Sequence, residues 1–205
     1  MKKMFFLVTA VVLFLLTMPS MTQAAIVDES QDYKQGIYDI SYPQFSGITS
    51  KEVQEKINRE MIEFASKFAV EQNTPDMQAA VMRYKVRYVS DTLLSLTVET
   101  YFFAGGAHGL TFLEGFTYDL QTGQRYNFAD LYPFGESARK SINQQIREQI
   151  AQKDIPTFGP FAGVSDKPQF FINKHGQPII FFQQYEIGPY VIGIQKFAVI
   201  AEKKK

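Results

Sequence analysis

The sequence predicts an α+β fold, with antiparallel β-sheets and two main helices packed on them. Several neighbouring segments alternate apolar and polar residues, which is typical of antiparallel strands. Two separate segments instead carry apolar residues at helical spacing. The chain has 30 aromatic residues, 11 Tyr and 19 Phe, and no cysteine. Its stability must therefore come from a packed core and not from disulfides.

The first 25 residues have the pattern of a secretory signal peptide. Lys2 and Lys3 precede an apolar run over residues 4–18, and small residues follow at 22–25. The run is shorter than the roughly 18 residues of a membrane-spanning helix. We expect cleavage after Ala24, with an uncleaved anchor as the alternative. Residues 25–205 would then form an extracytoplasmic domain (secreted, periplasmic or at the cell surface) with no stable membrane span.

The charge balance argues against a nucleic-acid partner. The leader holds two of the 21 basic residues and none of the 21 acidic ones, so residues 25–205 carry a net charge of −2. A nucleic-acid binder needs a clustered basic face. The domain is expected to have an N-terminal part at about 36–75 and a C-terminal part at about 79–200.

The N-terminal part is predicted to be one strand and one helix. Residues 36–45 alternate as a strand, which should end at Pro43 because proline cannot donate to the ladder. Thr49 and Glu52 then fit a capping box at the start of a long helix. The apolar stripe of this helix should cover a sheet, and it consists of Val53, Ile57, Met61, Phe64 and Phe68.

The next two strands can be paired from their apolar faces. Pairing Val86 with Leu94, and Tyr88 with Thr92, makes the two faces coincide and leaves a three-residue loop at 89–91. The opposite face of the first strand carries three cations. They would bind an anionic polymer, or they would form an ordinary exposed face matched with Glu99; the cations are Arg83, Lys85 and Arg87.

A third strand should follow at 110–120, with Phe102 opposite Leu110 and the turn centred on Gly106. A short helical turn then stops at Pro133. The second helix is predicted from the spacing of Ala138, Ile142, Ile146 and Ile150. The rest reads as a loop at 153–168, a hairpin turning at 173–176, a turn at 188–189 and a closing strand at 191–200.

The turn after the second strand holds the first candidate site, formed by Gly105, Gly106 and His108. His108 would act as a general base with a carboxylate such as Glu114 or Asp119, or it would simply bond the backbone. The glycines lack the GK[ST] sequence of a phosphate loop and should instead allow positive φ. The other histidine, His175, belongs to a turn of its own. The spacing of a metal site is missing, so no metal or other cofactor is predicted.

The second candidate site is the loop from Tyr185 to Tyr190, including Glu186. Phe181 and Phe182 are assigned to the sheet. Tyr185 and Tyr190 are the residues expected to stack on a sugar ring or on a protein partner.

Four stretches together resemble a bacterial extracytoplasmic module. They are "ISYPQFSGITSKEVQEKIN", "GGAHG", "FTYDLQTGQRYNFADLY" and "FFQQYEIGPYVIG". The module is a domain of unknown function found in lysozyme-sensing RsiV-type anti-sigma factors and in the N-terminal region of PdaC-type peptidoglycan deacetylases. The resemblance implies an α+β fold, an extracytoplasmic location and a peptidoglycan or lysozyme ligand. It supplies no catalytic residue, and a polysaccharide-deacetylase domain is not expected.

The leading hypothesis is a non-catalytic recognition module of the cell envelope that binds peptidoglycan or lysozyme. One alternative is a cell-wall polysaccharide hydrolase or deacetylase that uses His108 with a carboxylate. Another is a structural partner domain of an envelope protein.

Overall fold

The computed structural model describes residues 26–204 and confirms the α+β class. A five-stranded sheet has the order β1(Val27–Gln35)-β2(Tyr38–Ser46)-β3(Ala79–Val89)-β4(Leu93–Phe103)-β5(Leu110–Asp119). A three-stranded sheet has the order β6(Phe170–Ile172)-β7(Pro178–Phe182)-β8(Gln195–Ala198). The helices are α1(Lys51–Glu71), α2(Phe128–Leu131) and α3(Glu136–Gln152), with a 3₁₀ turn at Tyr190–Ile192. The leader predicted at residues 1–24 lies outside the described residues.

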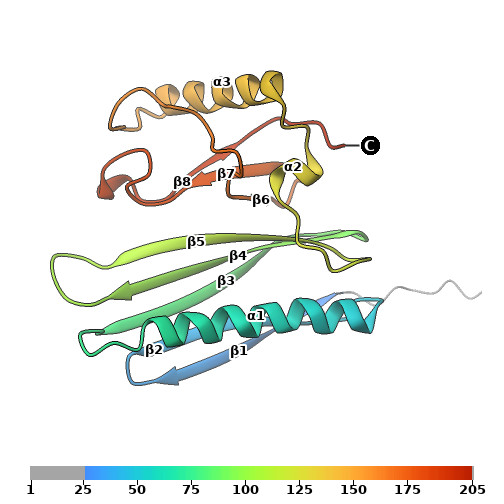
Figure 1. Ribbon diagram of the computed structural model, residues 1–205, viewed down its shortest axis with the longest axis vertical. Helices are drawn as coiled ribbons and strands as arrows, with labels where there is room; N and C mark the ends of the chain where they lie inside the picture. Colours follow the sequence, from blue (N-terminus) through green and yellow to red (C-terminus); the bar gives the residue numbers. More distant parts are fainter. Residues whose placement is uncertain (1–25, 205) are drawn as a thin grey trace, which may run out of the picture.

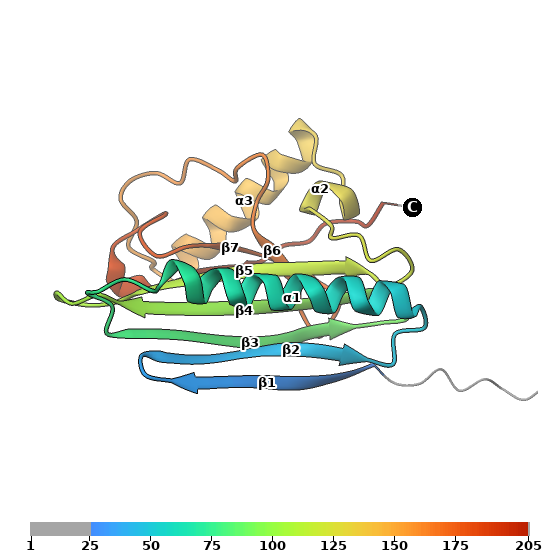
Figure 2. The same ribbon diagram turned by 60° about the horizontal axis from the view of Figure 1, so that its bottom comes forward.

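The elements stack in four layers: α1, the five-stranded sheet, the three-stranded sheet and α3 (Figures 1 and 2). One apolar core lies between α1 and the large sheet, and another lies around the small sheet and α3. No helix among residues 26–204 is long and apolar enough to cross a membrane.

Helix α1 buries the predicted stripe, with one correction at its start. Val53, Ile57, Met61 and Phe68 are buried, and Phe64 meets the ring of Phe116 edge-on at 5.2 Å. The remaining buried residue of the helix is Ala65. The N-cap is Ser50, whose hydroxyl accepts the N–H of Val53, so the predicted Thr49–Glu52 capping box is wrong by one residue.

The first strand was not foreseen. Strand β1 is exposed along its whole length and carries no apolar alternation, so it lacks the signal by which strands are recognised. It pairs with β2, which continues through Pro43 instead of ending there. Strand β2 pairs with β3 only over Tyr38–Ile40, so most of β2 has a strand partner on one side only. A missing N–H is therefore tolerated at Pro43.

The β2–β3 pair also corrects the expectation of purely antiparallel sheets. It is parallel, with α1 as the crossover, and the other described pairs are antiparallel. A parallel pair requires a long crossover connection, and the helix supplies it.

The β3–β4 register differs from the prediction by two residues at Val86 and by three residues at Tyr88. Val86 pairs with Leu96, and a bulge at Arg87 separates this pair from Tyr88–Ser95. The apolar faces coincide as predicted up to Val86. The extra residue of the bulge reverses the faces to which the following side chains of β3 point. Tyr88 therefore points to the face opposite α1 and packs against the core around the small sheet. The β4–β5 register is confirmed, with Phe102 opposite Leu110.

The face of the large sheet opposite α1 is partly covered by the small sheet. Leu113 packs there against Phe171, Ile179 and Phe181. Ser95 is fully buried; its hydroxyl lies 2.9 Å from that of Thr117 and accepts the N–H of Ile172 at 2.9 Å. The alternating polar residues on this face of the large sheet therefore include buried residues at the contact with the small sheet as well as residues exposed to water.

Candidate functional site

The β4–β5 turn carries the first set of predicted site residues. Gly105 and Gly106 have φ values of +89° and +97°, which glycine adopts without strain. His108 is exposed beside them, and its Nδ1 lies 3.1 Å from the carbonyl oxygen of Gly109. The turn thus projects the imidazole from the end of the sheet.

A second loop, at residues 183–192 between β7 and β8, is fixed beside this turn by the side chains of two glutamines. The side-chain oxygen of Gln184 accepts the N–H of Thr111 at 2.7 Å. The amide of Gln183 accepts the N–H of Leu113 at 3.0 Å and donates to its carbonyl oxygen at 2.7 Å. Strand β5 is an edge of the sheet, and these bonds occupy backbone groups that would otherwise be open. Sequence reasoning missed both glutamines.

Three rings from the two loops form one group, which we call the aromatic cluster: His108, Tyr185 and Tyr190. The rings of His108 and Tyr190 stack with centroids 3.8 Å apart at 17°. The hydroxyl of Tyr185 lies 3.1 Å from Nε2 of His108, and the hydroxyl of Tyr190 donates to the carbonyl oxygen of Gly109 at 3.2 Å. The structure therefore brings together residues predicted on separate turns.

Tyr185 has an unusual backbone within the cluster. Its φ is +64°, a region that residues other than glycine rarely occupy, and the residue is 46% exposed. The carboxylate of Glu186 accepts the N–H of Gln183 at 2.7 Å and closes the turn around Tyr185. Strained positions of this kind are concentrated at functional sites. Glu186 thus supports the turn from behind and does not join the three rings.

The carboxylates considered as partners for His108 lie elsewhere. Glu114 accepts a hydrogen bond from Arg125 at 2.6 Å, and Arg125 stacks over the ring of Phe116 at 4.0 Å. Asp119 lies at the opposite end of β5 from His108. The ring nitrogens of His108 contact the neutral groups of Gly109 and Tyr185. Within residues 26–204 no group of three or more His, Cys, Asp or Glu could hold a metal ion.

Asp119 instead organises the turn after β5. Its carboxylate accepts the N–H groups of Gln121 and Thr122 at 2.7 and 2.9 Å and the hydroxyl of Tyr126 at 2.6 Å. Burial pushes the pKa of Asp119 upward, but these hydrogen bonds outweigh it and lower the pKa below the usual value. The same bond from Tyr126, aided by burial, raises the pKa of that phenol to about 12.

Replacing Asp119 with asparagine should lower stability in a pH-dependent way. The folded pKa lies below the unfolded one, so the ionised group stabilises the fold above about pH 4, and this contribution is lost as the pH falls through the folded pKa. Urea unfolding should show Asp119→Asn less stable than wild type by about 1 kcal/mol at pH 7 and by less at pH 3. A difference that stays constant between pH 7 and pH 3 would show that the charge contributes nothing.

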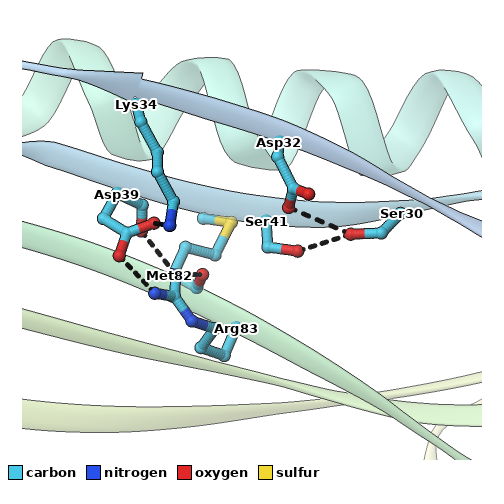
Figure 3. A network of polar contacts seen from close by, with 7 residues as sticks. All are labelled: Ser30, Asp32, Lys34, Asp39, Ser41, Met82 and Arg83. Carbon is cyan, nitrogen blue, oxygen red and sulfur yellow. Dashed lines mark hydrogen bonds and ion pairs between the residues drawn. The ribbon is translucent and has the colours of Figure 1, made fainter.

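The basic residues predicted on β3 do not act as one exposed group. The guanidinium of Arg83 turns to Asp39, which also lies 3.6 Å from Lys34 (Figure 3). Arg83 is directly opposite Glu99 in the register, but its ion pair is with Asp39. Arg87 is half-buried and donates to the hydroxyl of Thr97 at 2.9 Å. Arg83 is therefore neutralised by Asp39, and Arg87 is held against Thr97 instead of projecting freely into solvent.

A second aromatic surface lies near the same end of β4 and β5. A groove of about 260 Å³ runs between α1 and these strands, lined in part by Phe64, Phe68, Phe102 and Phe112. Phe102 and Phe112 stack with centroids 5.9 Å apart, and Phe112 is 41% exposed. It lies beside the strands that lead into the β4–β5 turn.

Comparison with known proteins gives two family matches. The model of the family described as deacetylase PdaC matches residues 27–111, and that of a protein family of unknown function, DUF3298, matches residues 129–200. No curated protein matches the sequence.

Two solved structures share the fold. A DUF3298 family protein from Pseudomonas aeruginosa is 18% identical, with a TM-score of 0.63. A DUF3298 family member from Bacteroides fragilis is 12% identical, with a TM-score of 0.61. Each match covers 85% of this chain and 89% of the other.

Proposed function

Because this chain joins a PdaC-type region to a DUF3298 region, we propose that it is a non-catalytic, extracytoplasmic recognition module that binds peptidoglycan through the aromatic cluster. The family matches support the setting, since one of the two families takes its name from a deacetylase. The leader pattern of residues 1–25 supports the location.

The main support for this proposal is the contact between two loops that are distant in the sequence. His108 and Tyr185 are 77 residues apart in the sequence, yet their side chains are in hydrogen-bond contact. The strained, positive φ of Tyr185 places an exposed phenol ring at the contact between the two loops. A phenol ring combines an apolar face with a polar hydroxyl, which suits the C–H faces and hydroxyl groups of sugars. Loops held on a rigid sheet are also where recognition residues concentrate.

The geometry favours binding over catalysis by His108. A histidine that acts as a general base must direct the free lone pair of a ring nitrogen at the substrate, and in most sites a polar partner orients the ring. Here one ring face of His108 is covered by Tyr190 and both ring nitrogens are engaged. The imidazole therefore serves as part of the surface that a ligand meets.

The experiment is co-sedimentation of the purified protein with insoluble peptidoglycan, with a parallel titration against soluble lysozyme. We expect the protein to sediment with peptidoglycan. Replacing Tyr185 with alanine should weaken binding by roughly tenfold, which corresponds to about 1.4 kcal/mol and lies near the upper end of the range for one aromatic contact. Tyr33→Ala is the matched control, since Tyr33 is 45% exposed on β1, outside the cluster.

Equal sedimentation of wild type and Tyr185→Ala would exclude the cluster as the contact surface. Binding to lysozyme without binding to peptidoglycan would replace the proposed ligand by a protein. Binding to neither ligand by the folded protein would refute the proposed function itself.

A further inference from the structure

We propose that the edge between the two sheets, at β3 and β8, binds a phosphate group through Lys85, Arg87 and Lys196. We call these three residues the basic seam. The site is separate from the aromatic cluster and independent of the proposed function. It takes up two of the three cations that the sequence singled out on β3.

The strand registers direct the three side chains into the same space. Lys85 is directly opposite Thr97, which is buried on the face of the large sheet that meets the small sheet. Lys196 is directly opposite Phe181, which packs in the core between the two sheets. Residues directly opposite each other project from the same face. Lys85 and Lys196 therefore project toward each other's sheet.

Arg87 lies on the same face of β3 as Lys85 and is the residue of the β-bulge, with no partner in the β3–β4 register. Its guanidinium lies over the ring of Phe171 at 5.0 Å and donates from Nε to the hydroxyl of Thr97 at 2.9 Å. These contacts hold the planar group in place without neutralising it. Its terminal nitrogens form no hydrogen bond or ion pair with any of residues 26–204, and they present the fork that matches phosphate oxygens.

The seam has an excess of positive charge. Among the described residues, no ion pair within 4 Å involves Lys85, Arg87 or Lys196. Arg83 is already paired with Asp39, as Figure 3 shows, and does not contribute. Within residues 26–204, Glu99 is the one carboxylate whose charge acts on both Arg87 and Lys196. Three cations facing one carboxylate leave a net charge of about +2, which matches a phosphate of charge about −2.

The directions of two pKa shifts agree with this geometry. Burial lowers the pKa of Lys196, and repulsion from Arg87 and Lys85 lowers it further, while Glu99 opposes the change. Burial likewise lowers the pKa of the Arg87 guanidinium. Both lowered pKa values mean that the positive charges of Lys196 and Arg87 are not fully balanced by negative charge in the free protein. A bound anion would supply that compensation.

The test measures thermal unfolding of the whole protein with added phosphate. The probes are inorganic phosphate, tripolyphosphate and long-chain polyphosphate, each against sodium chloride of equal ionic strength to remove general screening. Ligands that bind only the folded state raise Tm. We expect a rise with the phosphate probes, beyond that with chloride. A larger rise per phosphate group with the long chain would identify a polymer as the source, and an equal rise would identify the free anion.

Two variants make the assignment specific. Lys196→Gln should abolish the phosphate-dependent rise and leave Tm without phosphate unchanged or higher, because a repulsion is removed. Lys174→Gln, at an exposed lysine in the β6–β7 turn, should keep the full rise. The proposal is overturned by any of three results: no rise beyond chloride, a full rise in Lys196→Gln, or a lower Tm of Lys196→Gln without phosphate. The last would show a stabilising pair with Glu99.

Discussion

Replacing Gly115 with alanine is expected to lower the free energy of unfolding by about 2–4 kcal/mol, among the largest effects of a single added methyl group. Gly115 lies within β5, where β6 crosses the large sheet. A Cβ atom at this position would lie 2.0 Å from the carbonyl oxygen of Phe170. Backbone atoms cannot yield as a flexible side chain does, so the two sheets would have to move apart.

The separation would extend beyond the clash itself. The contact of Leu113 with Phe171 and Phe181 depends on the same close approach, as does the hydrogen bond from Ile172 to buried Ser95. Thermal unfolding should show a Tm lower by roughly 5–15 °C, given about 2–4 °C per kcal/mol for a chain of this size. Gly159→Ala is the control, since a Cβ there meets nothing within 4 Å and its φ is not positive. Equal Tm values for the two variants would contradict the direct packing of β6 on β5.

Replacing Tyr190 with alanine is expected to give the largest loss of binding, about 2 kcal/mol or roughly thirtyfold in Kd for peptidoglycan. Tyr190 is the centre of the aromatic cluster: its ring stacks on His108 and lies 5.7 Å from that of Tyr185. Its hydroxyl ties the second loop to Gly109. Removing the ring takes away both a contact surface and the support of its two neighbours.

A series at this position separates the two roles of Tyr190. Tyr190→Phe keeps the stack and loses only the hydrogen bond to Gly109, so we expect a loss of about threefold or less. If Tyr190→Phe weakened binding as much as Tyr190→Ala, the hydroxyl and not the stack would carry the interaction. Both variants should keep the wild-type Tm within a few degrees, because Tyr190 is only partly buried and belongs to none of the core clusters.

The elements that the sequence predicted well are those defined by local contacts. The stripe from Val53 to Phe68 specifies which face of α1 is buried, and the turn glycines fix Phe102 opposite Leu110. In both cases the residues that decide the structure are close in the chain.

The predictions that failed depend on neighbours distant in the sequence. Strand β1 forms because β2 offers an open edge, and nothing in its own polar residues shows this. The bulge at Arg87 reflects the core that Tyr88 enters on the far side of the sheet. A signal for the contact between the sheets was nevertheless present. A glycine inside a strand, as at Gly115, often marks the close approach of another backbone.

At the candidate site, too, the local features were predictable and the contacts between distant residues were not. Its two turns were recognisable from glycine and aromatic residues, but their contact depends on Gln183 and Gln184, whose side chains bind the edge of β5. Polar residues before a turn usually indicate only exposure. Their role as clamps becomes visible when β5 proves to be an edge strand.

We propose that the turn at 104–109 and the loop at 183–192 form one binding surface for peptidoglycan. The most direct test is an NMR titration of the isotope-labelled protein with soluble peptidoglycan fragments, following the backbone amide signals. We predict that signals of both segments shift together, with a single Kd, while those of β1 and α3 stay in place. Shifts confined to one segment, or centred elsewhere on the protein, would show that the two segments do not form one peptidoglycan-binding surface.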